Sequence, residues 1–284
     1  MSQIEHTIQV SEDIHLHTII STPNQPTAPT RPALVLFHFW GGTNNTYRPL
    51  ITHLCSDFAL IVPSLRGWGE SSRPTNPGAY LALLRKLDSD SPELFSNGVV
   101  LVGHSMGAKI AQLLLTQQHL LPPSVMIRGM VLLAPAPAGS HSLPPEMREQ
   151  QVHAYDNAAS AEFVVRNVLL GRLDAVSDRV VGEIVADAVA GSEGARAAWS
   201  RYGMEEDFED AVRGYGKYGG ALRVLVLVGE LDRVETEQSV KKRTVGVLLQ
   251  SGASVKAVTL SGTGHLSPVE AQEEVADAIR GFHF

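Results

Sequence analysis

Residues 99–107 read VVLVGHSMG, an apolar strand-like run that leads directly into a serine between two glycines. A helix-like pattern follows it. Serine on a sharp turn from strand to helix needs glycine on both sides, because a side chain there would collide with the neighbouring strand or the packed helix. Gly103 and Gly107 meet that need. The sequence therefore predicts a nucleophile elbow that carries the Ser105 hydroxyl out at the sheet edge, beside the free N–H groups of the new helix.

Other apolar runs recur on both sides of this turn. Two short β-type segments at residues 4–10 and 14–21, split by Glu12 and Asp13, predict an antiparallel hairpin. Further β-like runs follow at residues 33–38, 58–63, 130–134, 223–229 and 254–260, mostly separated by segments of helix length. This alternation predicts an α/β fold with a mainly parallel, doubly wound sheet and helices on both of its faces.

One long interval breaks the alternation. Residues 137–216 contain no good strand, and a set of apolar residues recurs there at helical spacing. The set is Val180, Val181, Ile184, Val185, Ala188 and Val189. We therefore expect residues 137–216 to form a helical cap over the strand ends, and residues 1–136 and 217–284 to form the core domain.

The elbow serine requires partners elsewhere in the chain. A serine hydroxyl is a poor nucleophile at neutral pH, so it needs a base, and the base needs an orienting group. Asp232 follows an apolar strand in LVGELD, with Glu230 as a rival acid two residues earlier. His265 follows the last strand in SGTGH. Because serine, acid and histidine in this chain order suit an elbow-type site, Ser105, Asp232 and His265 are the candidate catalytic residues.

These motifs together resemble those of the α/β-hydrolase fold family, in its cap-bearing esterase, lactonase and cofactor-free perhydrolase branch. The elbow, the GELD loop and the GTGH loop match in order, and LRGWGES at residues 65–71 looks like the family's Arg-Gly-x-Gly-x-Ser loop. HFWGG at residues 38–42 looks like its His-Gly-x oxyanion loop, with Phe39 where glycine is usual. The resemblance implies that two backbone N–H groups hold an oxyanion, that of Met106 and that of Trp40 with Phe39 as the alternative, without a metal or organic cofactor.

The implied activity is hydrolysis of a small ester or lactone through an acyl-enzyme on Ser105. Perhydrolysis and carbon–carbon bond hydrolysis are alternatives, because the same three residues can run them with peroxide or a ketone. Epoxide hydrolase and dehalogenase activities are disfavoured, because their intermediate requires an aspartate where Ser105 stands. A ligand receptor with little turnover is an alternative of another class, since a fold and a site alone do not fix biological use.

Composition limits the partners. The 284 residues have a net charge of -7 and a pI of about 5.9, without the clustered Lys and Arg that nucleic acid or an anionic membrane surface requires. We expect a small-molecule acyl substrate as the partner, and a monomer or homodimer. The single Cys55 excludes an intrachain disulfide, and residues 1–10 lack a signal-peptide pattern, so we expect a cytoplasmic protein. His15 and His17 have no third ligand nearby, so no metal site is expected.

Apolar residues of the oxyanion loop and the cap are candidates for substrate contact: Phe39, Phe163, Trp199, Tyr202, Met204 and Phe208. Those in the cap are equally compatible with the interior of the cap itself. His38 and His104 flank the site in sequence, and we expect them to order loops by hydrogen bonds. Ser267 and Glu270 have the spacing of a capping box with Pro268 at the first helical position, which predicts a helix start near Ser267.

Overall fold

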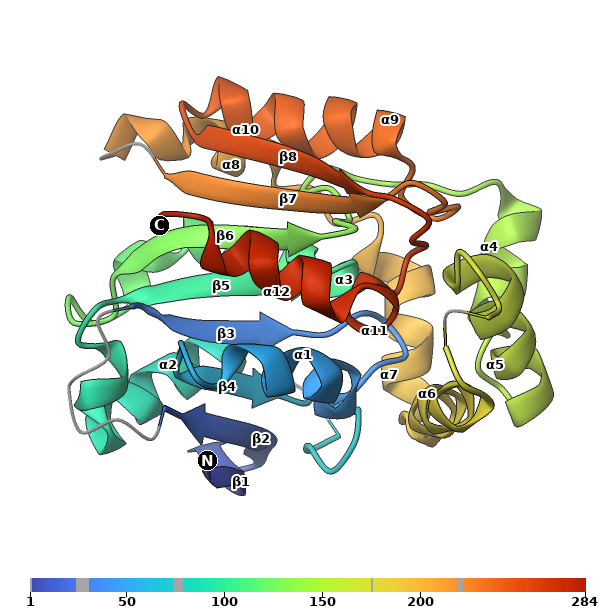
Figure 1. Cartoon of the computed structure of the whole chain (residues 1–284), viewed down its shortest axis with the longest axis horizontal. Helices are drawn as coiled ribbons and strands as arrows, with labels where there is room; N and C mark the ends of the chain where they lie inside the picture. The colour runs from blue at the N-terminus through green and yellow to red at the C-terminus, as the bar shows by residue number, and fades with distance from the viewer. Residues whose placement is uncertain (1, 24–30, 74–78, 175, 219–221) are drawn as a thin grey trace.

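The computed structural model describes residues 2–23, 31–73, 79–174, 176–218 and 222–284. Its centre is an eight-stranded sheet in the order β1-β2-β4-β3-β5-β6-β7-β8 (Figure 1). The strands are β1 (Ser2–Ser11), β2 (Ile14–Thr22), β3 (Ala33–Phe37), β4 (Leu60–Pro63), β5 (Val99–His104), β6 (Ile127–Leu133), β7 (Arg223–Gly229) and β8 (Ser254–Leu260). β1 and β2 form the predicted antiparallel hairpin, β2 runs antiparallel to β4, and the other neighbours are parallel. The predicted α/β fold class is confirmed.

Helices cover both faces of the sheet (Figure 1). One apolar layer includes α1 (Arg48–Leu54) and α12 (Gln272–Arg280), and the other includes α2 (Ala79–Asp90), α3 (Met106–Thr116), α8 (Glu209–Gly214), α9 (Glu237–Val240) and α10 (Gly246–Gln250). In β5, Val100 and Val102 belong to the first layer, and Val99 and Leu101 belong to the second. This strand is apolar at successive positions because it is buried on both faces. No helix in the described ranges is long and apolar enough to cross a membrane.

The long interval between β6 and β7 contains helices joined by loops, and no strand, where the structure describes it. It contains α4 (Pro145–Val152), α5 (Ala158–Val164), α6 (Asp178–Ala190) and α7 (Glu193–Ala198), followed by α8. The first four gather at one end of the molecule, beyond the carboxyl ends of the parallel strands (Figure 1). The apolar stripe around Val181 and Ile184 lies on α6, as its spacing predicts, and faces inward. The division into a core domain and a cap at residues 137–216 stays a prediction.

The sequence predicts the position at which the final helical segment begins, but the predicted capping box is wrong. α11 (Ser267–Glu270) begins at Ser267, but Leu266 is its N-cap and the buried Ser267 hydroxyl has no hydrogen-bond partner in the described part of the chain. Because Ser267 lies inside the helix, its hydroxyl is one position too late to cap it. Glu270 does reach back, and its carboxylate accepts from the N–H groups of Leu266, Gly264 and Gly171 at 3.1, 3.1 and 2.8 Å. The glutamate therefore fixes a loop rather than closing a capping box.

Candidate active site

Ser105 occupies a strained turn between β5 and α3. Its φ of 53° is in the left-handed region that residues other than glycine rarely adopt. A Cβ on Gly107 would lie 2.1 Å from the Phe37 carbonyl oxygen of β3, and a Cβ on Gly103 would lie 2.4 Å from Cα of Ala108. Both glycines are therefore needed for close packing, as the sequence predicts, and they place Ser105 at the carboxyl edge of the sheet with 8% of its surface exposed.

Asp232 and His265 form a buried pair at the same edge. The Nδ1 atom of His265 lies 2.9 Å from Oδ2 of Asp232. The other carboxylate oxygen of Asp232 accepts from the backbone N–H groups of Val234 and Glu235 at 2.8 and 2.9 Å. The carboxylate is therefore held by the backbone of its own loop on one side and orients the imidazole on the other.

Burial and charge act against each other in this pair. Burial raises the pKa of Asp232, but the charge and hydrogen bond of His265 and the two backbone N–H groups outweigh it, so the pKa is lowered overall. Burial lowers the pKa of His265, but Asp232, with smaller contributions from Glu235 and Glu270, outweighs it, so the pKa is raised overall. The pair therefore favours an ionised carboxylate beside an imidazole that accepts a proton readily.

Two further histidines order the loops around the site, as the sequence predicts. His104 Nε2 donates to the His265 carbonyl at 2.7 Å, and the two rings lie 5.3 Å apart, so the elbow and the histidine loop are neighbours. His38 Nδ1 donates to the Phe39 carbonyl at 2.7 Å, while His38 Nε2 accepts from the Leu65 N–H at 2.8 Å. Burial lowers the pKa of His38 to about 4 and that of His104 to about 3. Both rings are neutral structural groups.

Two backbone N–H groups in the loops that follow β3 and β5 are unpaired where the structure describes the chain. Within the described ranges, the N–H groups of Trp40 and Met106 donate no hydrogen bond to another protein group. Met106 is the first residue of α3, where an orphan N–H and the helix dipole favour negative charge. These donors make the edge near Ser105 suitable for an anionic oxygen.

Comparison with known families assigns most of the chain to one family. Residues 34–278, which run from β3 into α12, match the model of the alpha/beta hydrolase family. The chain belongs to this family. The matched span contains Ser105, Asp232 and His265, together with the whole interval between β6 and β7.

The hydrolase is similar to proteins of several activities. It is 32% identical to an epoxide hydrolase of Siraitia grosvenorii over 114 residues, which are 39% of this chain and about a third (34%) of the relative's length. A bromoperoxidase from Bacillus anthracis has a TM-score of 0.78 at 18% identity, with 98% of each chain covered. A carboxylesterase from Bacillus subtilis has a TM-score of 0.74 at 18% identity, with 99% of this chain and 92% of that one covered. At these identities the two solved structures show the fold alone.

The hydrolase does not bring its candidate substrate residues together. Phe39 is buried, with its ring 5.2 Å from that of His104. Phe163 and Tyr202 are 63% and 59% exposed on the cap. Trp199, Met204 and Phe208 instead surround Lys109, a residue of α3. Phe39 thus contacts the elbow through His104, and substrate contact by all six residues stays a prediction.

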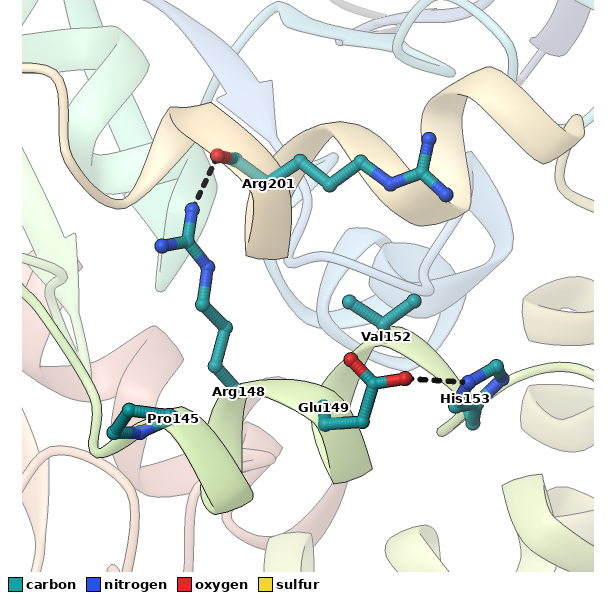
Figure 2. Close-up of a pocket in the computed structure, with 6 residues that line it drawn as sticks. All are labelled: Pro145, Arg148, Glu149, Val152, His153 and Arg201. Carbon is teal, nitrogen blue, oxygen red and sulfur yellow. Dashed lines mark hydrogen bonds and ion pairs between the residues drawn. The ribbon is translucent and has the colours of Figure 1, made fainter.

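A cavity of about 500 Å³ lies in the interval between β6 and β7, between α4 and the helical turn Trp199–Gly203 (Figure 2). Its lining residues are Pro145, Arg148, Glu149, Val152, His153 and Arg201. Figure 2 shows Arg148 reaching across to the Arg201 carbonyl, and Glu149 pairing with His153 at 3.2 Å. Because these side chains bind one another and include no predicted site residue, the cavity carries no argument for catalysis.

The two histidines considered as metal ligands, His15 and His17, have other partners. Across the described residues, no group of three or more His, Cys, Asp and Glu side chains could hold a metal ion. His15 bonds to the Ser72 hydroxyl at 2.8 Å, and His17 pairs with Glu5 at 3.4 Å. These two histidines therefore have hydrogen-bond partners of their own on the surface of β2.

Three residues near the site were missed by sequence reasoning. Glu235 is buried beside the pair, and burial raises its pKa to about 7; its place just after GELD was an available signal. Lys109 is buried on α3 and donates to the carbonyls of Met204 and Glu206 at 3.1 and 2.6 Å; a lysine within the apolar stretch of a helix was its signal. Tyr155 bonds to Trp40 across 115 residues, and no local pattern predicts that.

Proposed function

We propose that this hydrolase cleaves a small ester or lactone through an acyl-enzyme on Ser105. The observation that carries the proposal is the buried Asp232–His265 pair at the sheet edge where the strained elbow presents a serine. A serine needs such an oriented base to act as a nucleophile near neutral pH. Both the elbow strain and the burial of a charged pair are costly features, which is typical of active sites.

The mechanism follows from the roles of these groups. His265 takes the proton of Ser105 as the hydroxyl attacks the acyl carbon, and Asp232 orients and stabilises the resulting imidazolium. The N–H groups of Trp40 and Met106 receive the developing oxyanion. A preorganised donor of this kind is typically worth about 2.7–4 kcal/mol in the transition state. The leaving alcohol takes the proton back from His265, and water then releases the acid by the same route.

The nucleophile separates this proposal from the activity of the epoxide hydrolase relative. Opening an epoxide by covalent catalysis forms an ester with a carboxylate nucleophile, whereas position 105 offers a hydroxyl. Peroxide or a carbon–carbon substrate could use the same three residues, and product analysis with and without peroxide separates these reactions. The cytoplasmic location remains part of the proposal.

Covalent trapping tests the proposed nucleophile. A small fluorophosphonate should add once to the wild-type protein and not at all to Ser105→Ala, as read by intact mass. Deletion of such a nucleophile lowers kcat by about 10⁶-fold, so Ser105→Ala should have no measurable esterase activity. Ser21→Ala is the matched control, because Ser21 is a buried serine of β2 whose hydroxyl has no hydrogen-bond partner in the described structure.

Two results would count against the proposal. An adduct of equal yield on Ser105→Ala would place the nucleophile elsewhere. Wild-type protein that takes no adduct and hydrolyses no acyl substrate, but binds a small ligand tightly, would favour the receptor alternative.

A further inference from the structure

We propose that Tyr155 of the cap is a positioning residue for the oxyanion donor at Trp40. The inference rests on the proposed function, because it concerns the N–H that would hold the oxyanion. It goes beyond the proposed function because it makes the conformation of the oxyanion loop depend on a residue of the cap interval as well as on the core.

Direct contact joins Tyr155 to Trp40. The hydroxyl of Tyr155 donates to the carbonyl of Trp40 at 3.0 Å, and the two rings lie 4.3 Å apart with 41° between their planes. Tyr155 is 2% exposed, so water has little access to this bond. In the described part of the chain, no other group donates to the Trp40 carbonyl. Tyr155 is therefore the group that satisfies this carbonyl.

A closed ring of hydrogen bonds holds Trp40 from a second direction. The indole Nε1 of Trp40 donates to the carbonyl of Arg196 on α7 at 2.9 Å. The guanidinium of Arg196 in turn donates to the carbonyl of Tyr155 at 2.7 Å. Trp40, Tyr155 and Arg196 thus bind one another in a circuit of three hydrogen bonds and one ring contact. The side chain and the carbonyl of Trp40 are both fixed by the cap.

Fixing these two groups also fixes where the backbone nitrogen of Trp40 lies, because all three are bonded to Cα at set angles. The direction of the N–H is then limited by its own peptide plane, whose Phe39 carbonyl accepts from His38 Nδ1 at 2.7 Å and from the Gly42 N–H at 3.0 Å. Gly41 accommodates the tyrosine: its φ is +100°, and a Cβ there would lie 2.6 Å from the Tyr155 ring. The glycine at position 41 therefore leaves room for Tyr155 in the loop between β3 and α1, directly beside the Trp40 backbone that would supply the oxyanion donor.

The test is Tyr155→Phe, which removes the hydroxyl and keeps the ring. Because an oxyanion exists only after attack on the acyl carbon, kcat for a p-nitrophenyl ester should fall about 3- to 10-fold while KM stays within about twofold. The rate of fluorophosphonate labelling should fall by the same factor, since that reaction also develops negative oxygen. Melting temperatures and circular dichroism are recorded for every variant.

Tyr47→Phe is the matched control. Tyr47 is a second buried tyrosine whose hydroxyl donates to a backbone carbonyl, that of Phe37, at 2.9 Å. Phe37 is a strand residue paired with Gly103 of β5, which holds its backbone independently. The two variants should lose similar melting temperature, and only Tyr155→Phe should lose kcat.

The outcomes separate the two proposals. If wild type takes no fluorophosphonate adduct, the proposed function fails and the inference falls with it. If wild type is labelled on Ser105 and Tyr155→Phe matches its kcat and labelling rate, the inference alone is overturned. Equal losses of kcat in both tyrosine variants, or a change confined to KM, would also overturn it, because they would indicate a structural or substrate-binding role.

Discussion

One carboxylate oxygen of Asp232 is hydrogen-bonded to His265, and the other accepts hydrogen bonds from the backbone of its own loop. The rival acid Glu230 is placed differently: its carboxylate accepts from the Ser261 hydroxyl and the Gly262 N–H, both at 2.8 Å. Two acids separated by one residue in sequence thus have distinct partners. This distinction could not be read from the sequence, because it depends on how the loop after β7 turns against the loop after β8.

The protonation state of His265 predicts how kcat/KM depends on pH. The base must be neutral to accept the serine proton, and Asp232 raises the pKa of His265 above the ordinary value near 6.5. We therefore expect kcat/KM to increase with pH, with its inflection above 6.5, and to be lost as pH falls through that pKa. Asp232→Asn removes the opposing charge, so the inflection should move to lower pH, and kcat should fall by about 10⁴-fold.

The measurement is a profile of kcat/KM from pH 5 to pH 9 for wild type, Asp232→Asn and Glu230→Gln. Glu230→Gln should keep the wild-type inflection, because this carboxylate bonds only to the loop after β8 in the described structure. A normal profile for Asp232→Asn together with a shifted one for Glu230→Gln would assign the acid role to Glu230.

At the scale of elements, Lys109 joins the elbow helix to the cap interval. Its ammonium lies on α3, four residues after Ser105, and donates to the carbonyls of Gly139, Met204 and Glu206. The rings of Trp199 and Phe208 lie 5.9 and 5.8 Å from it. Burial lowers the pKa of Lys109 to about 8, with Glu206 and Asp207 opposing that shift. One buried ammonium group on α3 therefore binds backbone carbonyls near both the beginning and the end of the cap interval.

Because the pKa of Lys109 is lowered, the free energy of unfolding should depend on pH. Between pH 8 and about 10.4 the unfolded chain keeps the Lys109 proton longer than the folded chain does, so the free energy of unfolding should rise with pH in that window. Relative to Lys109→Met, the wild type should gain about 1–2 kcal/mol from pH 7.5 to pH 10, allowing for partial solvent access. Urea unfolding at both pH values measures the difference.

A surface lysine provides the comparison. Lys86 on α2 pairs with Asp90 and is largely accessible to water, so Lys86→Met should track the wild type at both pH values. If Lys109→Met shows the same pH dependence as wild type, the ammonium of Lys109 is not buried in the folded protein.

Elements that depend on local pattern were predicted well from the sequence, and contacts between elements were not. All eight strands are found. Those buried on both faces, such as β5, are apolar at successive positions, and the antiparallel pair β1 and β2 is marked by two short β-type segments around a polar turn. Gly103 and Gly107 mark the elbow by their need for space. The capping box at Ser267 failed because the helix already begins at Ser267, so that Leu266 is the N-cap and the serine hydroxyl lies inside the helix. Local spacing shows neither this shift of one residue nor the bond from the distant Gly171 to Glu270.

At the scale of the whole molecule, the cap interval contacts the oxyanion loop, the loop of Asp232 and the loop of His265. The carbonyl of Leu169 accepts from the His265 N–H at 2.7 Å, and that of Leu170 accepts from Arg233, next to Asp232, at 3.0 Å. Asp187 on α6 accepts from the Thr43 hydroxyl at 2.6 Å. Together with the bond from Tyr155 to Trp40, these contacts make the site a joint product of both segments, although the sequence separates them into two predicted domains.

Shared packing predicts that both segments unfold together. Cap residues such as Ala161, Val165 and Val181 belong to the same buried apolar cluster as the strands of the sheet, so exposing one segment exposes part of the other. Chains longer than about 150 residues often unfold through intermediates. For this chain we nevertheless expect one transition in urea, with coincident midpoints by tryptophan fluorescence and far-ultraviolet circular dichroism.

The three tryptophans allow the two segments to be distinguished. Trp199 belongs to the cap interval, whereas Trp40 and Trp68 belong to loops of the core that the cap covers. Because unfolding of either segment exposes the shared cluster, Trp199→Phe should lower the signal amplitude and leave a single transition shape. A separate fluorescence transition at low urea, present in wild type and smaller in amplitude in Trp199→Phe, would show that the cap unfolds alone. The hydrogen bonds that the cap makes to Trp40, Thr43 and His265 would then be too weak to join it to the core, and the site would lose its oxyanion loop and its histidine loop before the sheet unfolds.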